Sequence, residues 1–166
     1  MIEINYTVEE DGWKKNFPYF KKCISNTVTQ TLNIIHNEFP KKISVTFLLT
    51  SNKKIKELNF KFRNKNKPTN VLSFPMQLTY LDSFFLGDIA LSNQTLIKEA
   101  IEQKIAKYDY LCKITIHGML HLMGYDHKTE KQFKEMEKYE KQIYDTIRNQ
   151  LWLVNYSKKF LILRNF

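Results

Sequence analysis

Between Tyr108 and Met123 the chain is apolar almost all round, yet this stretch carries two of its four histidines. An apolar segment of this length predicts a helix that is buried on most of its surface. Imidazoles inside such a helix lose their hydration, so the fold has to supply them with a partner. A metal ion can be this partner. A buried helix of this chain of 166 residues is therefore also a candidate metal-binding element.

The spacing of the histidines indicates which metal site they form. They follow the pattern His-x3-His-x5-His at His117, His121 and His127. Helical residues four apart lie on one face, so the first two imidazoles can point at one place. Gly124 accepts the left-handed conformation that ends a helix, and the turn after it can bring the third imidazole there. Three neutral imidazoles with an open fourth position predict one catalytic Zn²⁺, although such sites also accept Ni²⁺ or Co²⁺.

The metzincin metalloproteases share this histidine spacing and its glycine. They place a glutamate general base directly after the first histidine, where this chain has Gly118. A metallopeptidase is therefore an alternative that lacks its usual base. The fourth histidine, His36, lies in a predicted helix, and we expect it to be a structural or exposed residue.

A basic segment precedes the histidines. Residues 53–67 hold seven basic side chains against one acid, and Arg63 is one of only three arginines in the chain. A guanidinium group can hold a phosphate through two hydrogen bonds, so we expect Arg63 to bind phosphate and to act in catalysis. Lys65 and Lys67 are expected to bind the same substrate, with a solvated basic loop as the alternative.

Two aspartates are candidates for further catalytic roles. Asp88 follows Gly87 at a predicted strand, where it can act as a general base or support the metal site. A turn residue that caps backbone amides is the alternative for Asp88. Asp126 stands beside His127 and can orient a water molecule or a histidine Nδ1 atom.

Short strands and helices are mixed along the chain without strict alternation, which predicts an α+β fold. We expect a single domain over residues 1–150, with a small mixed sheet of about four strands and five or six helices. The predicted strands are Ile2–Tyr6, Ile43–Thr50, Val71–Phe74, closed by Pro75, and Leu86–Leu91. The tail over residues 151–166 is apolar and basic, and its structure does not follow from its sequence.

The helices are predicted from apolar stripes and from residues that cap or end a helix. Besides the histidine helix, one is expected over Phe20–Phe39, and three more begin after Ser51, after Ser92 and near Thr129, which has capping-box spacing to Gln132. Their inner faces are expected to carry Ile55, Leu58 and Phe62; Leu96, Ile97, Ala100 and Ile101; and Phe133, Met136, Ile143 and Ile147.

Composition narrows the class of protein. The net charge of +9 favours a polyanionic partner such as nucleic acid, or an anionic membrane surface. Cys23 and Cys112 are too few for a disulfide framework, which makes a reducing compartment the default. No apolar run approaches the roughly 20 residues that span a bilayer, and the first residues do not read as a signal peptide. We therefore expect a cytoplasmic protein without a membrane partner.

Three segments together resemble one family. HGMLHLMGYDH (117–127), FRNKNKPTNVLSFP (62–75) and LGDIALS (86–92) are similar to the bacterial YbeY family of rRNA-maturation endoribonucleases. The histidine segment matches the family pattern HGxLHLxGYDH at every fixed position, and the resemblance covers roughly Ile43 to Ile147. The family often has glycine where this chain has Asn64, which affects only the local turn.

The resemblance implies a single α+β domain that is zincin-like around the metal. It implies zinc on His117, His121 and His127, and it identifies Arg63 as the family's functional arginine. It also implies cleavage of single-stranded rRNA on the small ribosomal subunit, in 16S rRNA 3′-end maturation and late ribosome quality control. An assembly factor with a structural metal is a further alternative. Some aromatic side chains are candidates for stacking on bases, with core packing as the alternative: Phe74, Tyr80, Phe84 and Phe85.

Overall fold

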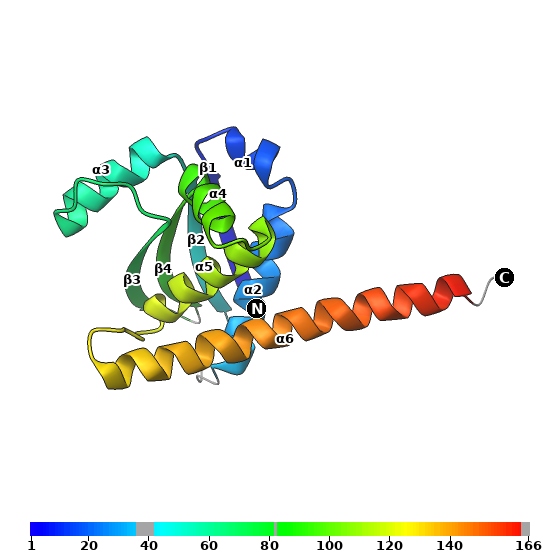
Figure 1. The fold of residues 1–166 in the computed structure, drawn as a ribbon. Helices are drawn as coiled ribbons and strands as arrows, with labels where there is room; N and C mark the ends of the chain where they lie inside the picture. Colours follow the sequence, from blue (N-terminus) through cyan, green and yellow to red (C-terminus); the bar gives the residue numbers. More distant parts are fainter. Residues whose placement is uncertain (36–41, 82, 164–166) are drawn as a thin grey trace.

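One mixed sheet organises the computed structural model, which describes residues 1–35, 42–81 and 83–163 and, from residue 151 on, the backbone alone. Its strands are β1 (Ile2–Val8), β2 (Lys42–Thr50), β3 (Val71–Tyr80) and β4 (Ser83–Ser92). In the sheet they follow the order β1-β2-β4-β3. β1, β2 and β4 run parallel, and β3 is an antiparallel edge strand beside β4 (Figure 1).

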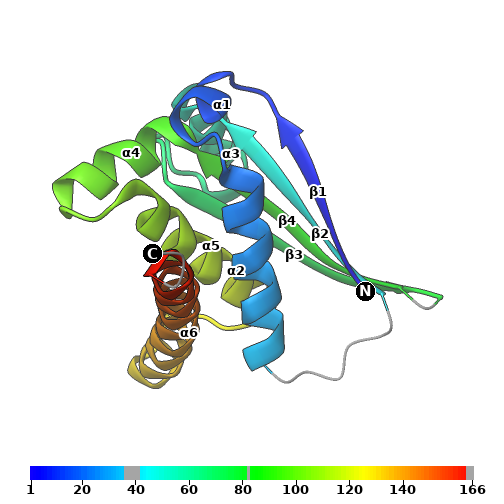
Figure 2. The same cartoon turned by 90° about the vertical axis from the view of Figure 1, so that its right-hand side faces the viewer.

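The helices cover both faces of this sheet. They are α1 (Gly12–Asn16), α2 (Phe20–Ile34), α3 (Asn52–Arg63), α4 (Asn93–Glu102), α5 (Lys107–Leu122) and α6 (Glu130–Leu163). On one face α3 packs through Ile55 against Leu72 and Ala90. On the other face α2, α4 and α5 enclose the main core with the sheet, and α6 lies beyond α5 (Figure 2). The predicted α+β fold with a four-stranded mixed sheet and six helices is confirmed.

The position of α5 explains why its sequence is apolar almost all round. Leu111 and Met119 face the sheet and belong to the main core. Ile116 and Leu120 face away from the sheet, and they pack against Met136 of α6. Burying one such side chain contributes about 1.5–3 kcal/mol, so both sides of α5 hold it in place. The helix that carries the histidines is therefore one of the best-anchored elements of the fold.

Gly118 lies where α5 packs closely against the sheet. A Cβ atom at this position lies 3.3 Å from side-chain atoms of Val71, Ser73 and Ile89. These three residues belong to β3 and β4, so position 118 faces the sheet and has no room for a larger side chain. The absence of glutamate after the first histidine is thus a consequence of packing as well as a clue to chemistry.

The predicted end of one strand is wrong. β3 continues through Pro75 to Tyr80 instead of closing at Phe74. Because β3 is the edge strand, the missing N–H of proline does not break the ladder there. The pairing with β4 shifts register between Pro75 and Leu78. Opposite this irregularity Gly87 has a φ of 138°, and a Cβ atom there would overlap the carbonyl oxygen of Phe74.

Three apolar side chains that were predicted on inner helix faces are exposed. They are Phe62, Ile101 and Phe133. Each lies in the first or last turn of its helix. The apolar stripe continues to these ends, but the layer beneath the helix does not. Figure 1 shows that α3 projects beyond the sheet, and Phe62 lies in the last turn of this helix.

Two of the three predicted helix caps are confirmed. The hydroxyl group of Ser51 accepts a hydrogen bond from the N–H of Lys54. The N–H of Gln132 donates to the Thr129 hydroxyl, and the Gln132 side chain accepts from the N–H of Thr129. Ser92 stands at the start of α4 but makes no side-chain cap, since its hydroxyl donates to the Asn52 side chain.

The remaining differences concern the helical ends and the first helix. α1 was not predicted from the sequence. α2 ends at Ile34, and both the predicted end at Phe39 and His36 lie outside the described residues. α6 continues through the tail to Leu163 and extends from the body as an arm (Figure 1). Within the part of the chain that the structure describes, no helix combines the length and apolarity needed to cross a membrane.

Candidate metal centre

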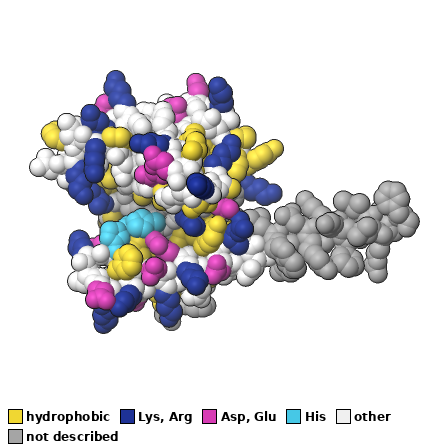
Figure 3. All heavy atoms as spheres, viewed as in Figure 1, with side chains coloured by type: hydrophobic (Ala, Val, Ile, Leu, Met, Phe, Trp, Pro, Cys, Tyr) yellow, Lys and Arg dark blue, Asp and Glu magenta, His cyan; other side chains and the backbone are white. Residues whose placement is uncertain are grey.

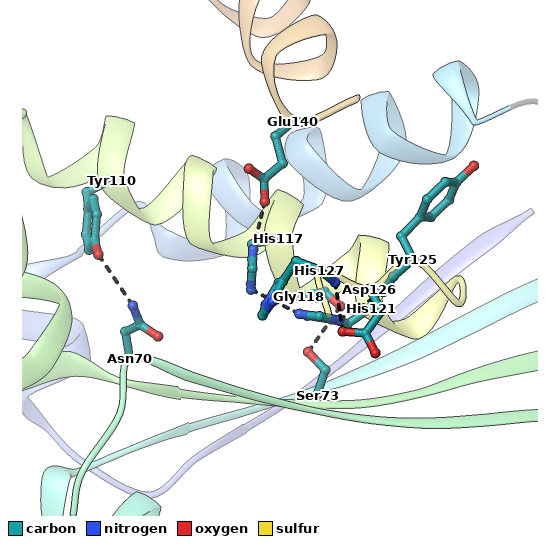
Figure 4. Close-up of polar contacts among 10 residues, drawn as sticks. All are labelled: Asn70, Ser73, Tyr110, His117, Gly118, His121, Tyr125, Asp126, His127 and Glu140. Atoms are coloured by element: carbon teal, nitrogen blue, oxygen red, sulfur yellow. Dashed lines mark hydrogen bonds and ion pairs between the residues drawn. The ribbon is translucent and has the colours of Figure 1, made fainter. Parts of the chain in front are cut away.

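The three histidines meet at the C-terminal end of α5 (Figure 4). His117 and His121 lie one helical turn apart, and their Nε2 atoms are 3.0 Å from each other. Gly124 ends the helix with a φ of 91°, and the following turn brings the His127 ring within 5.5 Å of the first ring and 5.1 Å of the second. One ligand atom from each of the three side chains lies within 4.8 Å of the others. The predicted convergence of the three imidazoles is confirmed.

Hydrogen bonds at Nδ1 orient the two helical imidazoles. Nδ1 of His117 lies 2.7 Å from a carboxylate oxygen of Glu140, and Nδ1 of His121 lies 2.9 Å from the carbonyl oxygen of Tyr125. Both partners are acceptors, so each Nδ1 carries the proton and each Nε2 presents a lone pair. These are the tautomers that ligate a metal through Nε2.

The spacing of the two Nε2 atoms tests whether a metal fits. The two Nε2 atoms lie 3.0 Å apart and face one point. Ligands at the usual Zn–N length of roughly 2.0–2.1 Å in tetrahedral geometry stand about 3.3–3.4 Å apart. A small adjustment of either ring reaches this value. The donor set of His117, His121 and His127 therefore fits a metal ion.

The surroundings of His121 keep its imidazole ready for a metal. Burial lowers the pKa of His121, and the neighbouring His117 lowers it further. A lowered pKa leaves the imidazole neutral near pH 7, with its lone pair available. Because protons and metals compete for the same nitrogen, this shift favours metal binding at neutral pH.

Glu140 is the residue of this site that sequence reasoning missed. It comes from α6 and orients His117 across 23 positions of the chain. A signal was present, since Glu140 lies four residues after Met136 and three before Ile143, on the buried stripe of α6. An acid at a stripe position needs a partner inside the fold.

Asp126 holds the turn that presents His127. One of its carboxylate oxygens accepts from the N–H of His127 at 2.8 Å, and the other pairs with Lys128 at 2.7 Å. The bond from Lys128 and the backbone bond together hold the pKa of Asp126 at about 2. The predicted role of orienting an Nδ1 atom is taken by Glu140 for His117 and by the carbonyl group of Tyr125 for His121.

The structure does not bring Asp88 to the histidines. Its neighbour Ile89 points toward Gly118 of α5. Side chains alternate along a strand, so Asp88 points to the opposite face, where Ala90 packs against α3. A role for Asp88 as a base at the metal is therefore not compatible with its position.

Arg63 is linked to the metal site through Ser73. Arg63 is the last residue of α3, is exposed, and donates from Nη2 to the carbonyl oxygen of Ser73 at 3.4 Å. The hydroxyl group of Ser73 donates to the carbonyl oxygen of Gly118 at 3.1 Å. Gly118 lies on α5 between the two helical ligands (Figure 4). One β3 residue thus ties the predicted phosphate-binding group to the predicted metal site.

The basic loop after α3 is held in a defined conformation. Asn64 adopts the left-handed region with a φ of 54°, which asparagine tolerates better than most residues, so the turn forms without glycine. The buried side chain of Asn59 donates to the carbonyl oxygen of Lys67 at 2.8 Å. Lys65 and Lys67 themselves are exposed.

The surface around the histidines carries many basic side chains. Figure 3 shows the histidines as one patch at the waist of the molecule, with lysine and arginine side chains above and below it. A hollow of about 680 Å³ lies between α5 and α6, beside Glu140. Its charged lining residues are four lysines and two glutamates: Lys113, Lys134, Lys138, Lys141, Glu137 and Glu140. Basic side chains outnumber acidic ones in this hollow, so it carries a net positive charge beside the histidine site.

Comparison with known proteins identifies similar proteins over most of the length of the chain. A family model described as Endoribonuclease YbeY matches residues 8–148. The endoribonuclease YbeY of Pelagibacter ubique is 39% identical over 153 residues, which cover 91% of this chain and 99% of the relative. The protein of the same name from Bartonella bacilliformis is 36% identical over 154 residues, covering 89% of this chain and 94% of the relative. That of Buchnera aphidicola is 35% identical and covers 100% and 97%.

Proposed function

Because this chain belongs to the endoribonuclease YbeY family, we propose that it is a zinc-dependent hydrolase that cuts single-stranded rRNA. One observation carries the proposal. Three imidazoles converge at one point, two of them oriented through their Nδ1 atoms, and Ser73 connects their helix to the exposed Arg63. The family resemblance extends the proposal to 16S rRNA 3′-end maturation and late ribosome quality control on the small ribosomal subunit, in the cytoplasm.

Three histidines and two acidic residues contribute to holding the ion. His117, His121 and His127 supply the ligand atoms, and Glu140 keeps a proton on Nδ1 of the first of these. Asp126 contributes by fixing the turn of the third ligand. When bound, zinc supplies Lewis-acid activation of a nucleophile and of a phosphoryl oxygen.

Arg63 binds the phosphate. Its guanidinium group has a fork of N–H donors, of which Nη2 contacts Ser73. The exposed fork holds a phosphate that approaches the histidines and offsets the negative charge that develops during cleavage. Lys65 and Lys67 attract the flanking backbone, and the lysines of the α5–α6 hollow extend this attraction to the other side.

The peptidase alternative loses support in the structure. A zincin peptidase uses a glutamate at the position of Gly118, and that position faces β3 and β4 at van der Waals distance. No described residue stands in for this base at the histidines, since Glu140 is committed to His117 and Asp126 to the His127 turn.

The experiment compares metal-depleted with zinc-restored protein on a single-stranded RNA and on casein. We expect cleavage of RNA only, only after zinc is restored, and none by His121→Ala. Arg63→Gln is expected to keep its zinc and lose cleavage. Arg148→Gln, an exposed arginine on α6 paired with Asp109, is the matched control and is expected to stay active. Cleavage of casein supports a peptidase, and RNA binding without cleavage supports an assembly factor with a structural metal.

A further inference from the structure

An exposed phenylalanine stands next to the phosphate-binding arginine. Phe62 is 55% exposed, although a phenyl ring on a helix is normally buried. Its centroid lies 5.1 Å from that of Phe74, with the two planes at 68°. Phe74 is partly buried and packs against Ile55 and Leu72. The ring of Phe62 is therefore supported by Phe74 and remains more than half exposed.

Two consecutive residues of α3 each contact one of two consecutive residues of β3. Arg63 contacts the carbonyl oxygen of Ser73, and Phe62 contacts the next β3 residue, Phe74. The hydroxyl group of Ser73 then reaches Gly118 between the helical histidines. The exposed ring, the guanidinium group and the metal site are thus joined by an unbroken series of contacts.

The charge around the ring favours an anionic ligand. The ammonium group of Lys61 lies 5.1 Å from the centroid of Phe62, over the ring. A ring face that accepts a mobile lysine side chain is accessible to other flat or cationic groups. Arg63, Lys65 and Lys67 follow in the chain, and no acidic residue lies between Lys61 and Lys67. Basic groups that alternate with an exposed aromatic ring form the usual surface for single-stranded nucleic acid.

We propose that Phe62 is a stacking platform for an unpaired RNA base, next to the phosphate held by Arg63. This inference rests on the proposed function and adds a binding site for the base. The phosphate and the base of one stretch of RNA then engage two adjacent residues of α3. Only a base that has left a duplex offers a free face to the ring, so the platform contributes to a preference for single strands.

The test uses full-length protein in EDTA, so that RNA is bound without being cut. A fluorescent single-stranded oligoribonucleotide is titrated with each variant, and its anisotropy gives the dissociation constant. Stacking on one aromatic side chain is worth about 1–3 kcal/mol, so Phe62→Ala is expected to weaken binding by about 5- to 150-fold. Phe62→Trp is expected to bind as tightly as the wild type, because a larger ring keeps the platform.

Phe60 provides a matched control. It lies two residues away on α3 and is 56% exposed. No ring contact joins it to β3 among the described residues. Phe60→Ala is therefore expected to change RNA binding by less than about twofold, since it removes equal aromatic surface away from the site.

A second oligonucleotide with abasic sites separates stacking from charge. The wild type is expected to lose affinity for it, whereas Phe62→Ala, which has no ring to stack on, loses little more. Phe62→Leu keeps an apolar contact with Phe74 and covers the case in which alanine unfolds the protein. Leucine binding as tightly as phenylalanine overturns the inference, as does equal affinity of the Phe62→Ala and Phe60→Ala variants for RNA.

The proposed function and this inference fail in different ways. RNA that the wild type neither binds nor cuts with zinc overturns both. RNA that is bound and cut by Phe62→Ala as by the wild type overturns the platform alone. Cleavage that persists at a reduced kcat/KM in step with the weakened binding supports both.

Discussion

Glu140 provides the sharpest test of how the metal site is built. Its carboxylate lies 2.7 Å from Nδ1 of His117, and it comes from a helix without metal ligands of its own. A bound cation withdraws electrons from the imidazole and makes its Nδ1–H a stronger donor. The hydrogen bond to Glu140 therefore strengthens when the metal binds, and its loss has to weaken metal affinity.

The structure sets the size of this effect. A hydrogen bond to a charged group contributes about 1.5–3 kcal/mol, and loss of such an outer partner lowers metal affinity about 10- to 100-fold. The side chains of His117 and Glu140 are 29% and 36% exposed, so water competes for the bond and the lower limit applies. We expect Glu140→Ala to weaken zinc binding about tenfold, or about 1.4 kcal/mol. Glu140→Gln keeps a neutral acceptor of about half the strength, so we expect about threefold.

Competition with a chromophoric zinc chelator measures these affinities directly, without an activity assay. Glu137→Ala is the matched control, because Glu137 is exposed on α6 and lines the same hollow without a bond to a histidine. It is expected to change zinc affinity less than about twofold. If Glu140→Ala binds zinc as tightly as the wild type, or no more weakly than Glu137→Ala, then α6 does not orient the ligand and the reasoning fails.

Three further outcomes follow from the packing and the protonation states. Gly118→Ala gains about 1 kcal/mol of helix propensity but places a Cβ atom 3.3 Å from side chains of β3 and β4, which costs about 1–3 kcal/mol, so the free energy of unfolding in urea is expected to fall by up to about 2 kcal/mol; a rise in stability contradicts this packing. Zinc at about 100 times its dissociation constant is expected to add about 2.7 kcal/mol and to raise Tm by several degrees, and His127→Ala is expected to abolish most of that rise. Burial, with the hydrogen bond to Glu99, raises the pKa of Tyr110 to about 12. The stability that this phenol contributes is present below about pH 10 and lost as the pH rises toward 12, so alkaline unfolding is expected to be steeper for the wild type than for Tyr110→Phe.

Local patterns were sufficient to predict the centre of the site. The four-residue spacing of His117 and His121 places them on one helix face, and Gly124 supplies the turn that returns His127. The apolar character of α5 predicted burial on both sides, which the sheet and α6 provide. These features depend on nearest neighbours in the chain, so no knowledge of the whole fold was needed.

Features that depend on the position of one element against another were missed or wrong. The side chains of β4 alternate between the two faces of the sheet as expected. This alternation alone does not say whether Asp88 lies on the face that meets α5. The predicted end of a strand at Pro75 is wrong because a strand can continue through proline at the edge of a sheet. The sequence does not say that β3 lies at the edge. Phe62 follows the apolar stripe of α3, but its exposure depends on where the sheet ends. Glu140 reaches His117 only because α6 packs across α5.

Ser73 connects the helix of Arg63 to the helix that carries the histidines. Its carbonyl oxygen receives the guanidinium group of Arg63 and its hydroxyl group bonds to α5, so a few covalent bonds separate the two anchorage points. The position of Arg63 relative to the histidine helix therefore depends on one residue of the edge strand.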